Sequence, residues 1–134
     1  MNRSQEKQRS IRFFSEKNNV MMTVHSREAR KYAERLEARA DIKSYEAGFG
    51  LNIEKFQYIN PVDIRKEYLG GEWFSDFLLH FEDGSLGVRE LVDKNSLSKR
   101  AVVERLELSR RYWSLFDIRD WKLVITGGEG DYVF

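Results

Sequence analysis

The sequence contains no cysteine among its 134 residues. This absence excludes disulfide bonds and thiolate chemistry, and it fits a cytoplasmic protein. No run of about 18 apolar residues occurs, which argues against a membrane-spanning helix. The polar opening MNRSQEKQRS does not have the form of a secretory signal. We therefore expect a cytoplasmic protein that has no membrane partner.

The chain also has little net charge. It carries 23 Lys and Arg residues against 22 Asp and Glu residues, so its net charge is +1 and the whole protein is not a polycation. Basic residues are nevertheless concentrated in residues 1–17 and 97–113. Local positive faces of this kind permit a nucleic-acid partner, while a solvated helix face is the more common reason for such a run.

Length and composition predict one globular domain. Hydrophobic residues make up 41% of the chain and aromatic residues 13%, which is enough to form a core, and 134 residues are too few for two comfortable domains. We divide the chain into a basic N-terminal arm, residues 1–19, and a single domain, residues 20–134. Only the stretch IRFF anchors residues 1–18, so we expect an arm or a short helix there.

Hydrophobic spacing in the first half predicts one helix between strands. A short strand is expected in NVMMTV (19–24). Residues 26–42 have apolar side chains at helical spacing behind Ser26, a typical N-cap. The next segment, 42–60, is expected to form a strand that ends before the single proline, and DIRKEYL (63–69) is expected to be extended as well.

The clearest pattern in the second half is a hairpin. Two alternating apolar stretches, WFSDFLLHF (73–81) and LGVRELV (86–92), flank an Asp-Gly turn. A helix in residues 95–116 and a strand in residues 120–126 follow. The expected caps of this helix are Asn95, Ser96 or Ser98, and the expected core residues of the hairpin are Phe74, Phe81, Leu86, Val88 and Val92. The order αβββαβ indicates the α/β class.

The hairpin carries two carboxylates on neighbouring strands, Asp76 and Glu90. Asp76 lies between the apolar stretches WFS and FLLHF, where an unpaired carboxylate would be costly. Magnesium prefers hard oxygen ligands and needs only one or two protein carboxylates besides water and a substrate phosphate. Glu28, in the first helix, is a third acid that the helix could bring to the same end of the sheet. Solvated surface positions remain the common alternative for each of them.

Three stretches together carry a resemblance to a known family. They are TVHSREARKYAERLEARADIKSYE, SDFLLHFEDGSLGVREL and ERLELSRRYWSLFDIRDWKLVIT, within residues 20–126. In this order they resemble the helix, the metal-binding hairpin, and the helix with closing strand of the TnsA-type endonucleases of heteromeric transposases, members of the PD-(D/E)xK restriction-nuclease superfamily. The resemblance implies a restriction-endonuclease-like core with a mixed sheet, a Mg²⁺ or Mn²⁺ ion, and DNA cleavage alongside a transposase or another mobile-element protein.

Carried over residue by residue, the resemblance gives a catalytic set. The family's helix glutamate falls on Glu28, its metal-binding aspartate on Asp76 and its second acidic position on Glu90, so the metal is expected between Asp76 and Glu90. Val92 stands where the family has a lysine, and valine cannot orient water or stabilise negative charge beside a phosphate. Lys94 would lie on the same face if the strand continued, and it completes the set as a provisional lysine.

Basic residues after the hairpin are expected to contact the DNA backbone: Lys99, Arg100, Arg105 and Arg110. Lys99 or Arg100 is also an alternative source of the positive charge that Val92 lacks, although only the amine could act as a base. The valine leaves a second hypothesis open, in which the nuclease fold has lost catalysis and binds DNA or a protein partner. A homodimer is compatible with both hypotheses.

Overall fold

A mixed α/β architecture follows from the element order of the chain. The computed structural model describes residues 10–128 and 132–133. In chain order the elements are β1 (Ile11–Ser15), β2 (Val20–Val24), α2 (Arg27–Ala38), β3 (Ile42–Gly50), the 3-10 helix η1 (Ile53–Tyr58), α3 (Lys66–Leu69), β4 (Phe74–Phe81), β5 (Leu86–Asp93), the 3-10 helix η2 (Lys94–Ser96), α4 (Arg100–Trp113), β6 (Asp120–Thr126) and β7 (Tyr132–Val133). Across these residues, none of the helices combines the length and apolar character needed to cross a bilayer.

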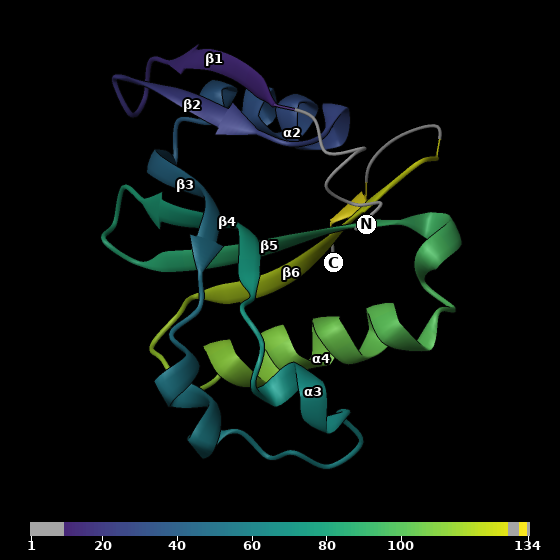
Figure 1. Ribbon diagram of the computed structural model, residues 1–134. Helices are drawn as coiled ribbons and strands as arrows, with labels where there is room; N and C mark the ends of the chain where they lie inside the picture. Colours follow the sequence, from purple (N-terminus) through teal and green to yellow (C-terminus); the bar gives the residue numbers. More distant parts are fainter. Residues whose placement is uncertain (1–9, 129–131, 134) are drawn as a thin grey trace.

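Among the described residues, the central sheet has five strands in the order β3-β4-β5-β6-β7. The pairs β3/β4, β4/β5 and β6/β7 are antiparallel, whereas β5/β6 is parallel. Helix α4 connects β5 to β6, because a parallel pair needs a crossover rather than a tight turn. Figure 1 shows α2 and the β1–β2 hairpin on one side of the sheet and α4 with α3 on the other. The sheet is therefore covered on both faces.

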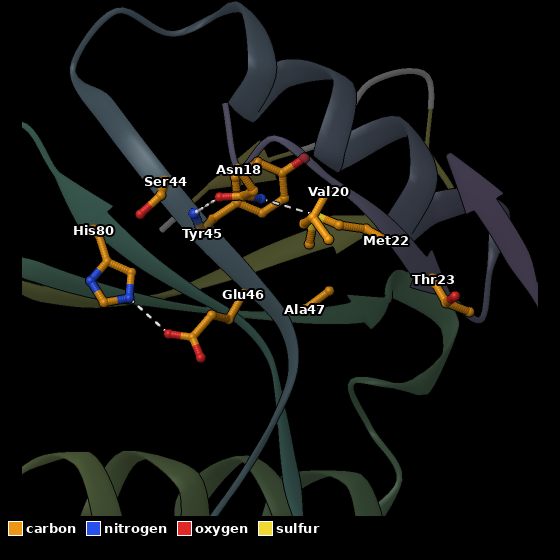
Figure 2. Close-up of a pocket in the computed structure, with 9 residues that line it drawn as sticks. All are labelled: Asn18, Val20, Met22, Thr23, Ser44, Tyr45, Glu46, Ala47 and His80. Carbon is orange, nitrogen blue, oxygen red and sulfur yellow. Dashed lines mark hydrogen bonds and ion pairs between the residues drawn. The ribbon is translucent and has the colours of Figure 1, made fainter. Parts of the chain in front are cut away.

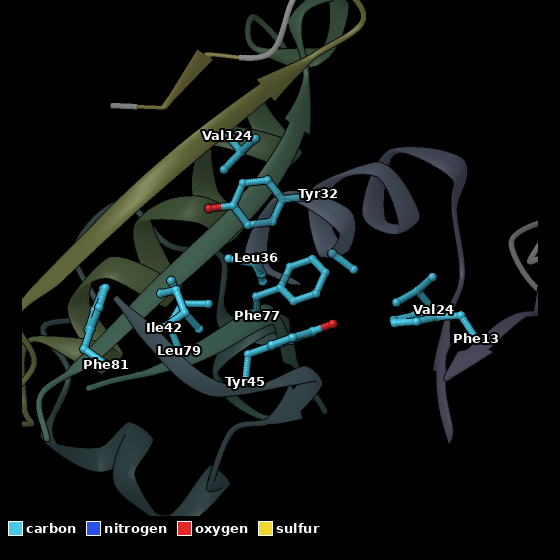
Figure 3. Packing of buried hydrophobic residues seen from close by; sticks show 11 residues of the cluster. Phe13, Val24, Tyr32, Leu36, Ile42, Tyr45, Phe77, Leu79, Phe81 and Val124 are labelled. Carbon is cyan, nitrogen blue, oxygen red and sulfur yellow. The ribbon is translucent and has the colours of Figure 1, made fainter. Parts of the chain in front are cut away.

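Each face of the sheet has its own apolar core. The α2-side core consists of Phe13, Val24, Tyr32, Ala33, Leu36, Ile42, Tyr45, Phe77, Leu79, Phe81 and Val124 (Figure 3). The α4-side core consists of Phe56, Ile59, Ile64, Leu78, Val88, Leu108, Tyr112 and Trp113. Of the hairpin residues predicted for the core, Phe81, Val88 and Val92 are buried and Leu86 is half-buried, but Phe74 is 55% exposed, so the prediction for Phe74 is wrong.

The N-terminal segment forms a strand instead of an arm or a short helix. β1 pairs antiparallel with β2, and Phe13 and Val24 pack into the α2-side core. The physical reason is visible in IRFFS: Phe13 and Ser15 are buried while Arg12 and Phe14 are exposed, which is the period of two of a half-buried strand. Residues 1–9 of the expected arm lie outside the described residues.

Two further expectations between β3 and β4 are corrected. Residues 53–58 form η1 rather than a strand, because Asn52 caps this turn by accepting a hydrogen bond from the backbone N–H of Glu54, at 3.0 Å. Residues 66–69 form the short helix α3 rather than extended structure. Strand β3 itself ends at Gly50, so the expected strand covers only the first half of its segment.

Helix α4 begins later than predicted. Its N-cap position is Lys99, which makes no side-chain capping hydrogen bond. Two of the expected caps, Asn95 and Ser96, belong instead to η2, where the Asp93 carboxylate accepts a hydrogen bond from the Asn95 N–H at 2.7 Å. Helix α2 begins behind its predicted Ser26 cap but ends at Ala38, four residues before the expected end. Strands β4, β5 and β6 lie where hydrophobic spacing predicts them.

Candidate functional site

Strand β4 changes the direction of its side chains at Asp76. Residues two apart on a regular strand point to the same face of the sheet. Phe77 packs in the α2-side core, but the hydroxyl of Ser75 accepts a hydrogen bond from Nε1 of Trp113 on α4, at 2.8 Å. Asp76 therefore lies at the position where β4 turns over.

Strand β3 turns over at the same level. Ala47 packs against the α2-side core, whereas Phe49 packs against the α4-side core. Gly48 lies between them with φ +65°, a left-handed conformation that favours glycine. In the register of the two strands Ala47 pairs with Phe77 and Phe49 with Ser75. Both strands are therefore irregular at the same level, and the side chain of Asp76 is not directed into either apolar core.

The two carboxylates of the hairpin replace the missing ladder between β4 and β5. Regular pairing of these strands reaches only Phe77 and Arg89. Beyond it, Asp76 Oδ2 accepts a hydrogen bond from the backbone N–H of Leu91 at 2.7 Å, and Glu90 Oε1 accepts one from the backbone N–H of Asp76 at 3.1 Å. The structure therefore brings Asp76 and Glu90 together, as the sequence predicted.

Glu90 is almost completely enclosed, at 1% exposure. Its Oε2 accepts a hydrogen bond from Ser109 Oγ on α4 at 2.5 Å, and Ser109 in turn accepts one from Nε1 of Trp121 at 3.0 Å. Burial and the nearby charge of Asp76 raise the pKa of Glu90 to about 7. Glu90 therefore faces α4 and holds the two strands in place, instead of facing open solvent.

Asp76 is the carboxylate that faces a cavity. The cavity has a volume of about 270 Å³ and lies between the start of α2 and the ends of β5 and β6, lined by Ser26, Glu28, Ala29, Asp76, Leu91, Val92, Asp93 and Thr126. Burial raises the pKa of Asp76, while the Leu91 N–H and the guanidinium of Arg105 act in the opposite direction. We call this space the acidic cavity, because three carboxylates lie on its wall.

The expected set of four residues is assembled only in part. Glu28 lies exposed in the first turn of α2 and shares the acidic cavity with Asp76. Lys94 does not continue the strand as expected, because β5 ends at Asp93 and Lys94 begins η2 with its side chain exposed. No lysine or arginine is among the described residues that line the acidic cavity. Within residues 10–128 and 132–133, no three acidic or histidine side chains group closely enough to hold a metal ion, so Glu28, Asp76 and Glu90 do not converge on one point.

The four basic residues predicted to bind DNA differ in their ion pairs and in their exposure to solvent. Arg100 pairs with Glu104, and Arg110 pairs with Glu107. Lys99 is exposed at the start of α4.

The fourth of them, Arg105, is half-buried and lines a narrow space beside Glu90. Arg105 therefore lies beside the pair of Asp76 and Glu90, rather than only on the surface where DNA would bind.

Sequence reasoning missed two contributors to this site. Asp93 lies on the wall of the acidic cavity, and Ser109 binds Glu90 from α4. Asp93 follows Leu91 by two residues on the same face of β5, and the turn-over of β4 brings Asp76 to that face. The only indication for Ser109 was its position on the apolar stripe of a helix, where a hydroxyl needs a partner.

A second hollow lies away from these acids, between β2 and the edge strand β3. Figure 2 shows its lining, with Asn18 reaching Tyr45: the Asn18 side-chain oxygen accepts a hydrogen bond from the Tyr45 N–H at 2.9 Å. His80 and Glu46 form a pair on its exposed side, with 2.8 Å between Nε2 and Oε2. The Asn18 contact joins the β1–β2 hairpin to the sheet, and the His80–Glu46 pair links β4 to β3, which accounts for His80 without a role at Asp76.

Replacing Glu90 with glutamine is expected to stabilise the metal-free protein at alkaline pH. A carboxyl group whose folded-state pKa is raised stabilises the fold fully below its unfolded pKa, and this contribution is lost as the pH rises through about 7. Glutamine removes the loss, so Glu90→Gln should gain on the order of 2–3 kcal/mol over the wild type at pH 8 relative to pH 5. Urea unfolding at both pH values in EDTA measures this difference. The exposed Glu82→Gln serves as control, and parallel pH profiles of the wild type and Glu90→Gln would contradict the expectation.

A scan against protein-family models finds no match for the chain, and a search of curated proteins finds none either.

Proposed function

We propose that this protein is a metal-dependent DNA endonuclease with a restriction-endonuclease-like core, resembling the TnsA subunit of heteromeric transposases. The observation that carries the proposal is the position of Asp76. Its carboxylate lies where β4 and β5 separate, is fixed by the Leu91 N–H and lines a cavity that Glu28 also lines. The element order from α2 to β6 and the resemblance of the three sequence stretches support the same function.

The chemistry of the donors fits Mg²⁺ or Mn²⁺. Glu28 and Asp76 offer hard carboxylate oxygens to one space, and such ions need no more than one or two of them. Both oxygens of Glu90 already accept hydrogen bonds, so we assign the ion to Asp76 and Glu28 and give Glu90 the role of holding Asp76. When bound, the ion would polarise the phosphoryl group and stabilise the leaving oxygen.

The residues of the chain have separate tasks in this proposal. Asp76 binds, because it is anchored at one oxygen by a backbone N–H. Glu90 positions the backbone of Asp76 and keeps water from the space between the strands. Arg105 supplies positive charge on the α4 side, which favours the charged form of Asp76 and a bound phosphate. Lys99, exposed at the start of α4, contacts the DNA backbone.

A second candidate function has one observation in its favour. Val92 is buried at 4% exposure in the position where the resemblance expects a lysine, and Lys94 is exposed in η2. A site without that amine loses the group that would orient water. The alternative is a nuclease-fold module that binds DNA or a protein partner without cleaving a phosphodiester bond.

Incubation with supercoiled plasmid separates these two functions. The endonuclease is expected to produce nicked or linear DNA with Mg²⁺ or Mn²⁺ and none in EDTA. Absence of cleavage with either ion, combined with DNA binding that weakens as salt rises, would contradict the endonuclease and support the binding module.

A further inference from the structure

A larger cavity adjoins the acidic cavity at Asp76. Its volume is about 530 Å³, within the range of pockets that hold small molecules. Strand β2, the start of α2, strand β3 and the beginning of β4 form its walls. It shares Ser26, Ala29 and Asp76 with the acidic cavity, so the two spaces meet at the proposed catalytic carboxylate.

The two spaces differ in charge. Glu28, Asp76 and Asp93 line the acidic cavity. Of the described residues around the larger cavity, only Asp76 and His25 are ionisable. Side chains such as Val24 and Ala47, small polar groups and the backbone of Gly48 make up the rest. The first space suits a cation, whereas the second suits a flat, neutral group.

Phe74 supplies an aromatic surface at the larger cavity. It is the first residue of β4, two positions before Asp76, and it is 55% exposed. Its ring is supported from one side by Gly50, because a Cβ added there would lie 3.4 Å from Cε2 of Phe74. An exposed ring held against backbone at the mouth of a cavity is the type of surface on which nucleic-acid bases stack.

We infer that the larger cavity binds the base of an unpaired nucleotide next to the phosphate at Asp76. The inference rests on the proposed function and names its substrate class: DNA in which one nucleotide is single-stranded, gapped or turned out of the duplex. A base inside a duplex is stacked on both sides and cannot reach a pocket of this kind. The apolar and small polar part of the lining accepts the base, Phe74 stacks on it, and the acidic cavity receives its phosphate together with the cation.

Two DNA probes test the inference by binding rather than cleavage. One is a duplex with a single unpaired 2-aminopurine, and the other is the same duplex fully paired, both with Ca²⁺ in place of Mg²⁺. Wild-type protein is expected to bind the first probe more tightly and to quench its fluorescence. Phe74→Ala should weaken binding of the unpaired probe by about 10-fold and leave the paired probe unchanged, because one stacked base is lost.

Controls separate stacking from folding. Phe74→Leu keeps apolar volume over Gly50 but removes the ring, and it should lose the quenching as Phe74→Ala does. Tyr58→Ala removes an aromatic ring that is 64% exposed on η1 and does not line the cavity, and it should change neither probe. Equal affinity of the wild type for the two probes, no binding of either, or full quenching by Phe74→Leu overturns the inference.

The result also distinguishes the inference from the proposed function. Stacking of the unpaired base without cleavage of any DNA would contradict the endonuclease and support the base pocket. Cleavage of plasmid with no preference for the unpaired probe would support the endonuclease and overturn the base pocket.

Discussion

Asp76→Asn is expected to lower the rate of plasmid nicking by at least about 100-fold while the protein remains folded. A bound metal ion contributes several kcal/mol to transition-state stabilisation, and each ~1.4 kcal/mol corresponds to a factor of ten in rate. Asparagine cannot supply the negative charge that holds the ion. Its side-chain oxygen can still accept the hydrogen bond from the Leu91 N–H, which the Asp76 carboxylate accepts at 2.7 Å.

The same substitution should not reduce stability. Burial raises the pKa of Asp76, which means that the folded protein disfavours its charged form. A neutral isostere removes that cost at pH 8. Urea unfolding of Asp76→Asn is therefore expected to give a free energy equal to or above that of the wild type, measured in EDTA beside the nicking assay.

Two further variants show whether the loss of nicking is specific to Asp76. Asp117→Asn makes the same chemical change at an exposed position outside both cavities, and it should keep full nicking activity. Glu28→Gln should reduce nicking by less than Asp76→Asn, because Glu28 is exposed and has freedom that Asp76 lacks. Nicking by Asp76→Asn at the wild-type rate would remove Asp76 from the site and the endonuclease proposal with it.

Short-range patterns predicted the part of the fold that depends on neighbours in the sequence. The hairpin β4–β5 was evident from its Asp-Gly turn, and Gly84 at that turn has φ +90°. Helix α2 was evident from its apolar spacing and from Ser26, whose hydroxyl accepts a hydrogen bond from the Ala29 N–H at 3.0 Å. The Ser26 cap spans three residues, and the turn and the apolar spacing are local as well, so a short window on the sequence contains them.

The error at Phe74 and the incomplete picture of the site arise from contacts between distant segments. Alternation along β4 predicts that Phe74 lies in the core, but β4 turns over at Asp76 opposite Gly48, 28 residues earlier in the chain. The same event brings Asp76 to the cavity that Asp93 also lines. Pairing between strands decides where such an irregularity falls, and the alternation of one strand contains no record of it. The pair of Asp76 and Glu90 was predictable because it belongs to a single hairpin.

The buried arginine of β5 gives the second large effect, and it too depends on a distant residue. Arg89 is 2% exposed, and its Nη1 donates hydrogen bonds to Asp120 Oδ1 at 2.7 Å and to the carbonyl of Val88 at 2.9 Å. Its Nε is buried and has no hydrogen-bond partner among the described residues. Asp120 begins β6, which pairs with β5 in parallel, so this carboxylate is the main compensation for the buried charge.

Asp120→Ala is therefore expected to lower the free energy of unfolding by about 3–5 kcal/mol, because it leaves a guanidinium buried without a counter-ion. Urea unfolding at pH 7 measures the loss. The exposed Asp117→Ala, three residues earlier, should stay within about 0.5 kcal/mol of the wild type.

The double variant Arg89→Met/Asp120→Ala identifies the cause of that loss. If the uncompensated charge is responsible, removing the arginine as well should restore most of the stability, because methionine fills similar volume without a charge. A double variant as unstable as Asp120→Ala would place the cost in lost packing around β5 instead. Recovery is the expected outcome, since the only buried side-chain nitrogen without a hydrogen-bond partner among the described residues belongs to this arginine.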